Sequence, residues 1–278
     1  MISVLILTKN EELDLPGCLA SIHWCDDIHV LDSGSTDATI DIARAAGARV
    51  TTRTYASTKI FGGDEAAHRN WSLRNIAYQH PWLLLLDADE RVTPDLYASI
   101  SQFVNSPNDF SAMRIRRRDF FMDAWLKHVQ TSPYYLRVFR PEKMRYERAV
   151  NCVSLVDGPV GSLHGHLDHY PFSKGMSHWL DRHNAYSSLE ARQIKQNRDL
   201  HAKFSLLKAF SASDFHERRF HQKELFYRLP FRAVIKFLIL YVGKLGFLDG
   251  RAGLTYAVLQ SVYEYMIVLK VRELDREK

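Results

Sequence analysis

The chain has 278 residues and is 46% hydrophobic, which is ordinary for a globular protein and leaves ample core for one large or two smaller domains. A net charge of +5 and a pI of about 9.0 permit an anionic partner, such as a nucleotide, a phosphorylated lipid or a membrane surface, without requiring one. The three cysteines, Cys18, Cys25 and Cys152, lack metal-ligand spacing and favour reduced thiols in a cytosolic compartment.

Neither end of the chain predicts a membrane-spanning segment. The start, residues 1–10, has no basic leader and becomes polar early, so it indicates a first strand rather than a signal peptide. The longest apolar run near the other end, residues 233–248, is interrupted by Lys236 and Lys244. It is too short and too charged to predict a transmembrane helix.

The first third of the chain predicts alternating strands and helices. Strands are expected at residues 2–8, 28–31 and 48–54, with a helix between each pair. The second of these helices is expected to be capped by Ser35 or Thr36. This order of elements is typical of a doubly wound parallel sheet.

An acidic pair follows the most apolar stretch of the chain. A helix predicted at residues 64–79 precedes an unbroken apolar run that starts at Trp82 and ends at Asp87 and Asp89. The run suits a strand buried on both faces, and ligands of open α/β sheets bind at the carboxyl ends of such strands. In an extended chain the two carboxylates would lie on one face and suit a divalent cation shared with substrate phosphates. A solvated acidic turn is the alternative. Thr93 is expected to cap the next helix.

The pattern changes after residue 110. Residues 112–118 and 134–139 predict half-exposed strands around an aromatic-rich loop, and residues 150–167 predict short strands with turns at Gly158 and Gly161.

From about residue 177 the chain is predicted to be helical. The segment 200–248 is basic and aromatic, which suggests attachment to an anionic membrane surface. A helical subdomain with a solvated basic face is the alternative.

Taken together in their order and spacing, several short motifs resemble the family 2 glycosyltransferases with the GT-A fold. Within that family they resemble the bacterial lipopolysaccharide-core β-1,4-glucosyltransferases. The motifs are residues 7–12 (LTKNEE), 32–39 (DSGSTDAT), 69–70 (RN), 86–90 (LDADE), 161–170 and 246–253 (GFLDGRAG).

The resemblance implies an α/β GT-A fold, a Rossmann-like mixed sheet with a C-terminal helical region. The catalytic domain would span residues 1–175, with a nucleotide-sugar half at 1–110 and an acceptor half at 111–175. Residues 176–278 would form the helical, basic and membrane-associated region.

The resemblance also implies an inverting, metal-dependent hexosyltransferase. It would use Mg²⁺ or Mn²⁺ and move a sugar, by preference glucose from UDP-glucose, to a lipopolysaccharide-core or related surface-glycan acceptor. The implied location is the cytoplasm, peripheral on the cytoplasmic face of the inner membrane. Nucleic acid is not an expected partner.

The matching motifs imply the residues for nucleotide and cation, and the basic run 114–118 with the aromatic loop after it suggests those for the acceptor. Nucleotide-sugar binding is assigned to Thr8, Asn10, Glu11, Asp32, Arg69 and Asp87. Asp87 and Asp89 would hold the cation, with His169, rather than His164 or His166, as a further ligand; Asp89 is also counted as catalytic. The acceptor is assigned to Arg116, Arg117 and Trp125.

Each assignment has a plainer alternative. Asp32 is otherwise a loop acid that caps a helix, and Arg69 is otherwise a partner in a surface salt bridge. His169 is otherwise a hydrogen-bonded structural histidine. The basic residues of 114–118 are otherwise the solvated face of a strand.

The catalytic base is the position where the chain departs from the pattern. Relatives carry a glutamate where this chain has Cys152, and a thiol with a pKa near 8.5 is a poor base for a sugar hydroxyl. Glu147 is the first candidate for the base, with Asp119 and Asp157 as alternatives. An offset of a residue or two in the match to the family, or an altered reaction, would also account for the cysteine.

Other functions remain open on the sequence alone. The acceptor could be a polyprenyl phosphate, or the protein could bind nucleotide or polyanion without transferring a sugar. A dinucleotide oxidoreductase is disfavoured, because no Gly-x-Gly-x-x-Gly motif follows the first strand.

Overall fold

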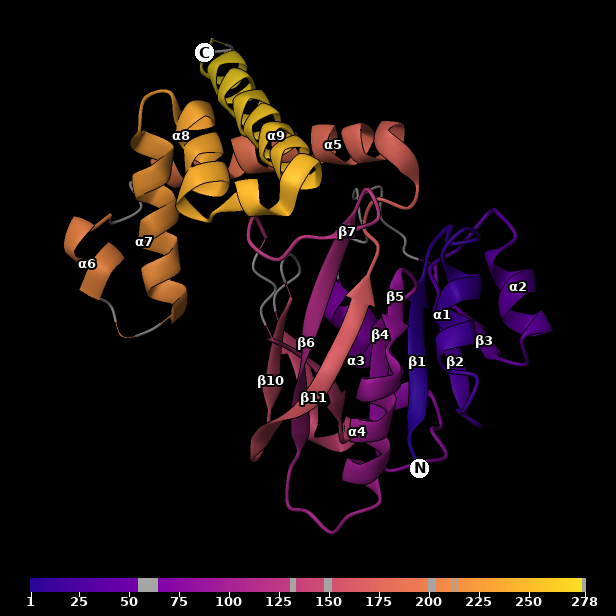
Figure 1. The fold of residues 1–278 in the computed structure, drawn as a ribbon. Helices are drawn as coiled ribbons and strands as arrows, with labels where there is room; N and C mark the ends of the chain where they lie inside the picture. Colours follow the sequence, from indigo (N-terminus) through magenta and orange to yellow (C-terminus); the bar gives the residue numbers. More distant parts are fainter. Residues whose placement is uncertain are drawn as a thin grey trace. The chain divides into compact units, whose positions relative to one another are not determined.

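The computed structural model describes residues 1–54, 65–130, 134–147, 152–199, 204–211, 213 and 215–276. The chain divides into two compact units (Figure 1). Unit 1 contains Met1–Phe120 and Ser132–Ser173, and unit 2 contains Phe121–Thr131 and Lys174–Lys278.

Unit 1 is built on a mixed sheet. Its strands are β1 (Ser3–Thr8), β2 (Ile28–Asp32), β3 (Arg49–Thr52), β4 (Leu83–Asp87), β5 (Glu90–Val92), β6 (Ala112–Phe121), β8 (Tyr134–Phe139) and β11 (Val160–His169). Their order is β3-β2-β1-β4-β8-β6-β11-β5. The strands from β3 to β4 are parallel, as is the pair β6–β11, whereas β8 and β5 run antiparallel to their neighbours. The predicted parallel half of the sheet is therefore confirmed, and the second half is mixed.

The helices of unit 1 follow individual strands. They are α1 (Leu15–Ser21), α2 (Thr39–Ala45), α3 (Glu65–Asn75) and α4 (Pro94–Val104). A short 3₁₀ helix, η1 (Pro141–Lys143), leads into a separate two-stranded sheet of β9 (Met144–Glu147) and β10 (Val153–Val156).

The apolar run before the acidic pair is buried on both faces, as predicted. On β4, Leu84 and Leu86 belong to one core cluster, and Leu83 and Leu85 belong to another that also contains Ala66 of α3. Alternate residues of a strand point to opposite faces, so helices must cover both sides of this strand.

Helix caps were predicted with mixed success. The hydroxyl of Thr93 accepts a hydrogen bond from the Leu96 N–H at 3.3 Å and caps α4, which confirms that prediction. The expected cap of α2 by Ser35 or Thr36 is wrong, because the N-cap residue is Ala38. The Ser35 hydroxyl donates to Asp32 instead, and the Thr36 N–H donates to Asn10.

Two further local predictions are corrected. Asp87 and Asp89 do not share one extended segment, since β4 ends at Asp87 and a turn separates it from β5. Gly161 lies within β11 rather than in a turn. Gly158 does lie just before that strand with a φ of +119°, a conformation that favours glycine.

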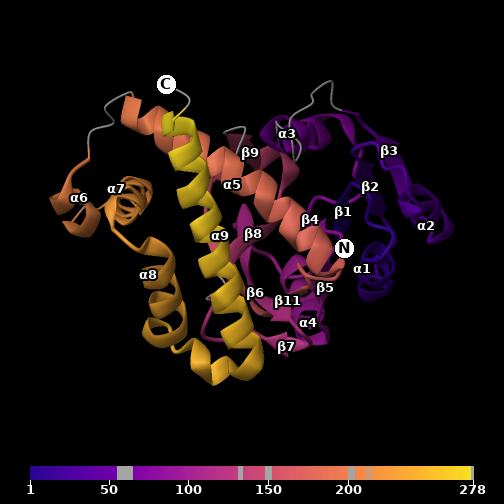
Figure 2. The ribbon, with the colours of Figure 1, turned by 90° about the horizontal axis from the view of Figure 1, so that it is seen from above.

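Unit 2 is helical apart from β7 (Ala124–Trp125). It contains α5 (Gly175–Asp199), α6 (Leu206–Ser211), α7 (Phe215–Arg228), α8 (Arg232–Leu238), the π-helical turn η2 (Ile239–Gly243), the 3₁₀ turn η3 (Gly246–Asp249) and α9 (Gly250–Arg276). Helix α9 packs along both α5 and α8 (Figure 2). Within the described ranges, no helix combines the length and apolar character needed to cross a bilayer.

The motif at residues 246–253 has a clear structural role within unit 2. A Cβ atom on Gly253 would collide with the carbonyl oxygen of Gly246, so the two backbones can meet here only because residue 253 is glycine. Asp249, between them, accepts hydrogen bonds from the N–H groups of His128 at 2.9 Å and Val129 at 2.8 Å. This motif joins the segment before residue 131 to the C-terminal helices.

Candidate active site

The loops after β1 and β2 form one end of the site. Thr8 and Asp32 are register partners on these parallel strands, so their side chains meet at the carboxyl edge of the sheet. The Thr8 hydroxyl donates to Asp32 at 2.9 Å, and the backbone N–H groups of Gly34 and Ser35 donate to the same carboxylate at 2.9 and 2.8 Å. Asp32 is fully buried and thus organises its own loop.

The other two residues expected at the nucleoside lie in the first of these loops. The Asn10 N–H donates to the Ser35 hydroxyl at 2.8 Å, and Asn10 Oδ1 accepts from the Thr36 N–H at 2.8 Å. The Glu11 N–H donates to the Thr39 hydroxyl at 2.7 Å. The two loops are therefore cross-linked into a single rigid edge, and the role of these side chains toward a nucleoside remains a prediction.

A histidine that the sequence did not single out lies beside this edge. His68 of α3 is buried, with its Nε2 atom 3.3 Å from the Ser33 hydroxyl and its Nδ1 atom 3.4 Å from an Arg53 nitrogen. Burial, together with the charges of Arg53 and Arg69, lowers the pKa of His68 to about 4. The imidazole is consequently neutral near pH 7.

Asp87 is held by an arginine that sequence reasoning also missed. Arg137 of β8 is buried and donates to Asp87 at 2.7 Å and to Glu90 at 2.6 Å. Glu90 in turn accepts from the Asp87 N–H at 2.9 Å. Burial opposes ionisation of Asp87, but Arg137 and Arg69 outweigh it and lower the pKa of this carboxyl well below its usual range.

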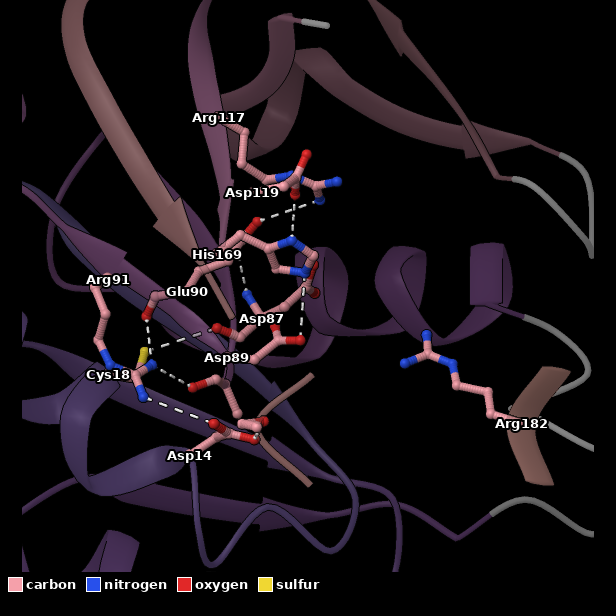
Figure 3. Close-up of polar contacts among 12 residues, drawn as sticks. Asp14, Cys18, Asp87, Asp89, Glu90, Arg91, Arg117, Asp119, His169 and Arg182 are labelled. Carbon is pink, nitrogen blue, oxygen red and sulfur yellow. Dashed lines mark hydrogen bonds and ion pairs between the residues drawn. The ribbon is translucent and has the colours of Figure 1, made fainter. Parts of the chain in front are cut away.

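Asp89 lies next to His169 (Figure 3). The turn that carries Asp89 is fixed to the end of β11 by a hydrogen bond from the Tyr170 N–H to the Asp89 carbonyl at 2.9 Å. His169 Nε2 lies 3.3 Å from the Asp89 carboxylate, and His169 Nδ1 lies 2.5 Å from the carboxylate of Asp119 on β6. Asp119 is fully buried and also pairs with Arg117 at 2.9 Å.

His169 is held between two carboxylates. Burial alone would lower the pKa of His169, but hydrogen bonds to Asp119 and Asp89 raise it to about 9. His164 and His166 lie earlier on β11, and His166 is three residues from His169 in a regular stretch, so its side chain points to the other face of the strand. The structure thus places His169, and not its two neighbours, beside the acidic turn.

Arg69 is half-buried, and its ion pair with Glu65 is the kind of contact that the plainer interpretation expects, so its role toward a phosphate remains a prediction. It pairs with Glu65 at 2.5 Å and lies over the ring of Tyr146. Burial disfavours its charge, yet Asp87 and Glu65 raise its pKa, so the guanidinium remains a cation. The next residue, Asn70, exchanges hydrogen bonds of 2.7 and 2.9 Å with the Tyr146 backbone and ties α3 to β9.

The candidate bases differ in their surroundings. Asp119 is buried and engaged by His169 and Arg117, so it is a poor base for a substrate hydroxyl. Glu147 and Asp157 are both exposed, with Glu147 3.6 Å from Arg145. Cys152 is half-buried and packs against an apolar cluster of unit 1. Residues 150 and 151, next to Cys152, lie outside the described residues.

The three acceptor residues are not gathered into one place in unit 1. Arg116 is exposed on β6, whereas Arg117 is half-buried and pairs with Asp119. Trp125 belongs to unit 2, where the Lys127 ammonium lies 4.9 Å from its ring centre. Their role toward an acceptor remains a prediction.

The acidic turn suits a cation that takes only part of its coordination shell from protein. Among the residues that the structure describes, no group of three or more His, Cys, Asp or Glu side chains is arranged to hold a metal. The Asp89 oxygen and the His169 nitrogen are nonetheless 3.3 Å apart, a separation that two ligands of one ion can have. Mg²⁺ usually keeps several waters and binds through one or two carboxylates plus substrate phosphates, which fits this arrangement.

Glycosyltransferases are among the curated proteins that this chain resembles in sequence. Lipopolysaccharide core biosynthesis glycosyltransferase LpsC of Rhizobium meliloti (strain 1021) is 26% identical over 284 residues, which cover 95% of this chain and 92% of LpsC. An uncharacterized glycosyltransferase of Rickettsia bellii is 31% identical over 108 residues, 38% of this chain and 34% of that protein.

Structural and family comparisons identify the fold and the family. The mannosyltransferase PcManGT from Pyrobaculum calidifontis, solved in complex with GDP-Man and Mn²⁺, is 15% identical with a TM-score of 0.52, covering 97% of this chain and 86% of that one. This likeness supports the fold alone, and it agrees with the predicted GT-A architecture and C-terminal helical region. Residues 3–156 match the family model described as Glycosyl transferase family 2. Because that match covers more than half of the chain, the protein belongs to glycosyl transferase family 2.

Proposed function

We propose that this glycosyltransferase is an inverting, metal-dependent hexosyltransferase that moves glucose from UDP-glucose to a lipopolysaccharide-core or related surface glycan. The observation that carries the proposal is the cluster of Asp87, Asp89 and His169 at the carboxyl end of β4, beside a half-buried cationic Arg69. The printed name of LpsC, similar over nearly its full length, supports a lipopolysaccharide-core acceptor.

The donor would lie along the carboxyl edge of the sheet. The loops of Thr8 and Asp32, cross-linked as described, would hold the nucleoside, and a carboxylate such as Asp32 can accept from the N–H of a uracil ring. Arg69 would pair with the diphosphate, since a guanidinium presents a fixed fork of donors to phosphate oxygens. Asp89 would hold the cation together with diphosphate oxygens, and His169 would join them by releasing the Nε2 proton that its raised pKa keeps on the ring near pH 7.

The reaction requires neutralisation of the negative charge on the diphosphate leaving group and removal of the proton from the acceptor hydroxyl. The bond between the anomeric carbon and the diphosphate breaks, and the electron pair leaves with the diphosphate. A bound Mg²⁺ or Mn²⁺ supplies positive charge to that leaving group. Arg69 adds a second, permanent positive charge beside it.

Glu147 is the proposed base. It would take the proton of the acceptor hydroxyl as that oxygen attacks the opposite face of the sugar, which inverts the anomeric centre. Its neighbour Tyr146 is anchored to Asn70, next to Arg69, so β9 is held against the helix that carries the proposed diphosphate ligand. Glu147 is exposed and thus accessible to an acceptor.

The protein is proposed to act on the cytoplasmic face of the inner membrane as a peripheral protein. Large apolar residues are exposed on the helices of unit 2, among them Phe231, Val242 and Leu248. Basic residues interleave with them, including Lys236 and Lys244. Exposed apolar side chains combined with positive charge favour attachment to an anionic membrane.

The test compares wild-type protein with Asp89→Asn. A thermal-shift screen of sugar nucleotides with and without Mn²⁺ should show stabilisation of the wild type by UDP-glucose plus Mn²⁺, because a ligand that binds the folded state stabilises it by mass action. Asp89→Asn should lose the part of this stabilisation that depends on Mn²⁺. Its transfer rate should fall by a factor of at least about 100. The exposed Asp95→Asn serves as the matched control.

Product analysis tests the acceptor. Labelled glucose should appear in a lipopolysaccharide-core glycan when that acceptor is supplied. Label in a butanol-extractable lipid instead would identify a polyprenyl phosphate acceptor. If Asp89→Asn kept full activity and full Mn²⁺ response, the proposed metal site would be wrong.

A further inference from the structure

Unit 2 contains a cavity that plays no part in the site described above. It has a volume of about 600 Å³ and lies among α5, α7, α8 and α9. Its polar wall contains Arg198, Arg232 and Arg272, with Asp275 as the acidic residue among those that line it. An excess of arginines over carboxylates around one cavity favours an anionic ligand.

Arg232 gives the cavity a buried donor that lacks a partner. Its side chain is 5% exposed; Nε pairs with Glu264 at 2.8 Å, and Nη1 donates to the Tyr227 carbonyl at 3.3 Å. Among the described residues, Nη2 and Nε are both buried and lack a partner with hydrogen-bond geometry. The guanidinium of Arg232 thus adds positive charge to the wall of the cavity, with only part of its hydrogen-bonding capacity used by protein.

The other two arginines lie on exposed positions of neighbouring helices. Arg198 belongs to the last turn of α5 and is 3.5 Å from Asp275, a partner that is itself half exposed. Arg272 is exposed on α9. Guanidinium groups from separate helices can bind the oxygens of one phosphate group in pairs of parallel hydrogen bonds.

Apolar residues continue from the cavity onto the surface of the same helices. On α9 the exposed side chains recur at helical spacing, in the set Leu254, Val258, Val262, Tyr265 and Leu269. On α8 and its flanks they form the set Phe231, Val234, Leu238 and Val242. Both sets lie along single helix faces, and α8 and α9 are side by side (Figure 2).

Two residues connect the surface to the cavity. Phe231, which is 83% exposed, and Tyr265 belong to the apolar sets and also line the cavity. A ligand with its anionic group among the arginines can therefore extend an apolar tail along exposed apolar side chains. Soluble monomeric proteins rarely expose large contiguous apolar patches unless a partner covers them.

We propose that this cavity binds the phosphate headgroup of an anionic membrane lipid, with the acyl chains lying along the apolar faces of α8 and α9. The inference rests on the membrane association proposed above and assigns it to a specific site. It does not depend on the identity of the donor sugar, because unit 2 alone supplies every residue that the inference uses.

The test is flotation with vesicles of phosphatidylcholine alone or mixed equally with phosphatidylglycerol. The full-length double variant Arg198→Gln/Arg272→Gln is compared with Arg192→Gln/Arg276→Gln, which removes the same charge from exposed positions of the same two helices but outside the cavity. We expect the first pair to weaken binding to the anionic vesicles about five-fold per arginine, and the control pair to weaken it much less.

Further arms identify the part of the lipid that is recognised. Phe231→Ser should also weaken vesicle binding, because it removes an exposed apolar contact. Inorganic phosphate and glycerol phosphate should raise the melting temperature of the protein only slightly. They are supplied at the lipid concentration at which the vesicles bind all of the protein. Equal stabilisation by these free anions would overturn a lipid site in favour of a soluble anion site.

Two outcomes would overturn the site as a whole. Equal loss of vesicle binding in the two double variants would show that general charge, not the cavity, attracts the membrane. Undiminished binding in Arg198→Gln/Arg272→Gln would exclude the arginines. The stabilisation by UDP-glucose and Mn²⁺ is measured in the same variants and should be unchanged, so failure of the lipid site and failure of the proposed transfer reaction are separate results.

Discussion

At the scale of single residues, Asp119 illustrates control by a side chain that need not touch substrate. It is fully buried, and its hydrogen bond to His169 Nδ1 leaves Nε2 directed at Asp89. A carboxylate behind a metal-binding histidine fixes the orientation of the ring. We therefore regard Asp119 as a positioning residue for the proposed cation site.

Asp119→Asn is expected to raise the Mn²⁺ concentration needed for half-maximal transfer by about 10- to 100-fold, because the ring would lose its orienting partner. Initial rates across an Mn²⁺ titration measure this. Asp168→Asn, which removes the neighbouring carboxylate paired with Arg118, is the control and should change the Mn²⁺ requirement little. If Asp119 had a purely structural role, Asp119→Asn would lower the stability of the protein against urea without changing its Mn²⁺ requirement.

His68 predicts a pH dependence of stability. Its pKa in the folded protein is about 4, below the value near 6.5 for an unfolded chain. Between these values the unfolded state binds more protons, so stability is complete above about pH 6.5 and decreases as the pH falls toward 4. His68→Gln should flatten this part of the curve of melting temperature against pH.

The exposed His23→Gln provides the comparison for that measurement. A flattening of the curve in His68→Gln that is not seen in this variant would identify His68 as the source of the acid sensitivity. Parallel curves for both variants would remove His68 as the source of the acid sensitivity.

At the scale of elements, β4 connects core and chemistry. Its leucines fill the clusters on both faces, and the strand ends at the carboxylate that Arg137 holds. Leu84→Ala should destabilise the protein by about 2 to 5 kcal/mol, the usual range for such a cavity in a core. Urea denaturation measures this, with the exposed Leu13→Ala as the control. A loss as small as that of Leu13→Ala would show that β4 is not central to the core.

Helices and strands with strong periodic patterns could be predicted from the sequence. Which residues they would contact across the sheet could not. The apolar run of β4 and the Thr93 cap followed from local sequence. Strand β5 was missed because three residues are too few to show a period. Arg137 and His68 were missed because periodicity tells which way a side chain points, but not which distant carboxylate or hydroxyl it will meet.

The site itself was partly predictable for the same reason. Asp32, Asp87 and Asp89 follow strands, and parallel strands bring their carboxyl ends to one edge. His169 was chosen over His164 and His166 from the resemblance at residues 168–170. Its contacts with Asp89 and Asp119 could not be predicted, since they depend on the pairing of β11 with β5 and β6. The surroundings of Glu147 and Asp119 depend on which strands pair, and those pairings are long-range.

At the scale of the whole molecule, the two units differ in how they are stabilised. Unit 1 has large apolar clusters on both faces of its sheet, whereas unit 2 has a smaller apolar cluster around Ile194 and Ile267, exposes many apolar side chains and adds specific polar contacts. The Asp249 carboxylate is one of these contacts, since it collects hydrogen bonds from the backbone at His128 and Val129.

Asp249→Asn should destabilise unit 2 by about 1.5 to 3 kcal/mol at pH 7, the range for hydrogen bonds to a charged group. Burial opposes its ionisation, but these hydrogen bonds lower the pKa of Asp249, so its contribution is present above about pH 4 and is lost as the pH falls. Hydrogen exchange at Val129 measures the loss. Asp275→Asn, which removes surface ion pairs, should change exchange there little.

The hydrogen bonds around Asp249 also limit where the protein can be truncated. The chain passes from unit 1 into unit 2 for residues 121–131, returns, and leaves again after Ser173. A version ending at Ser173 would keep Val129, which is fully buried, while deleting Asp249 and Gly246 that enclose it. A protein truncated after Ser173 should thus aggregate when expressed. A soluble truncated variant would need a tight polar turn in place of residues 121–131.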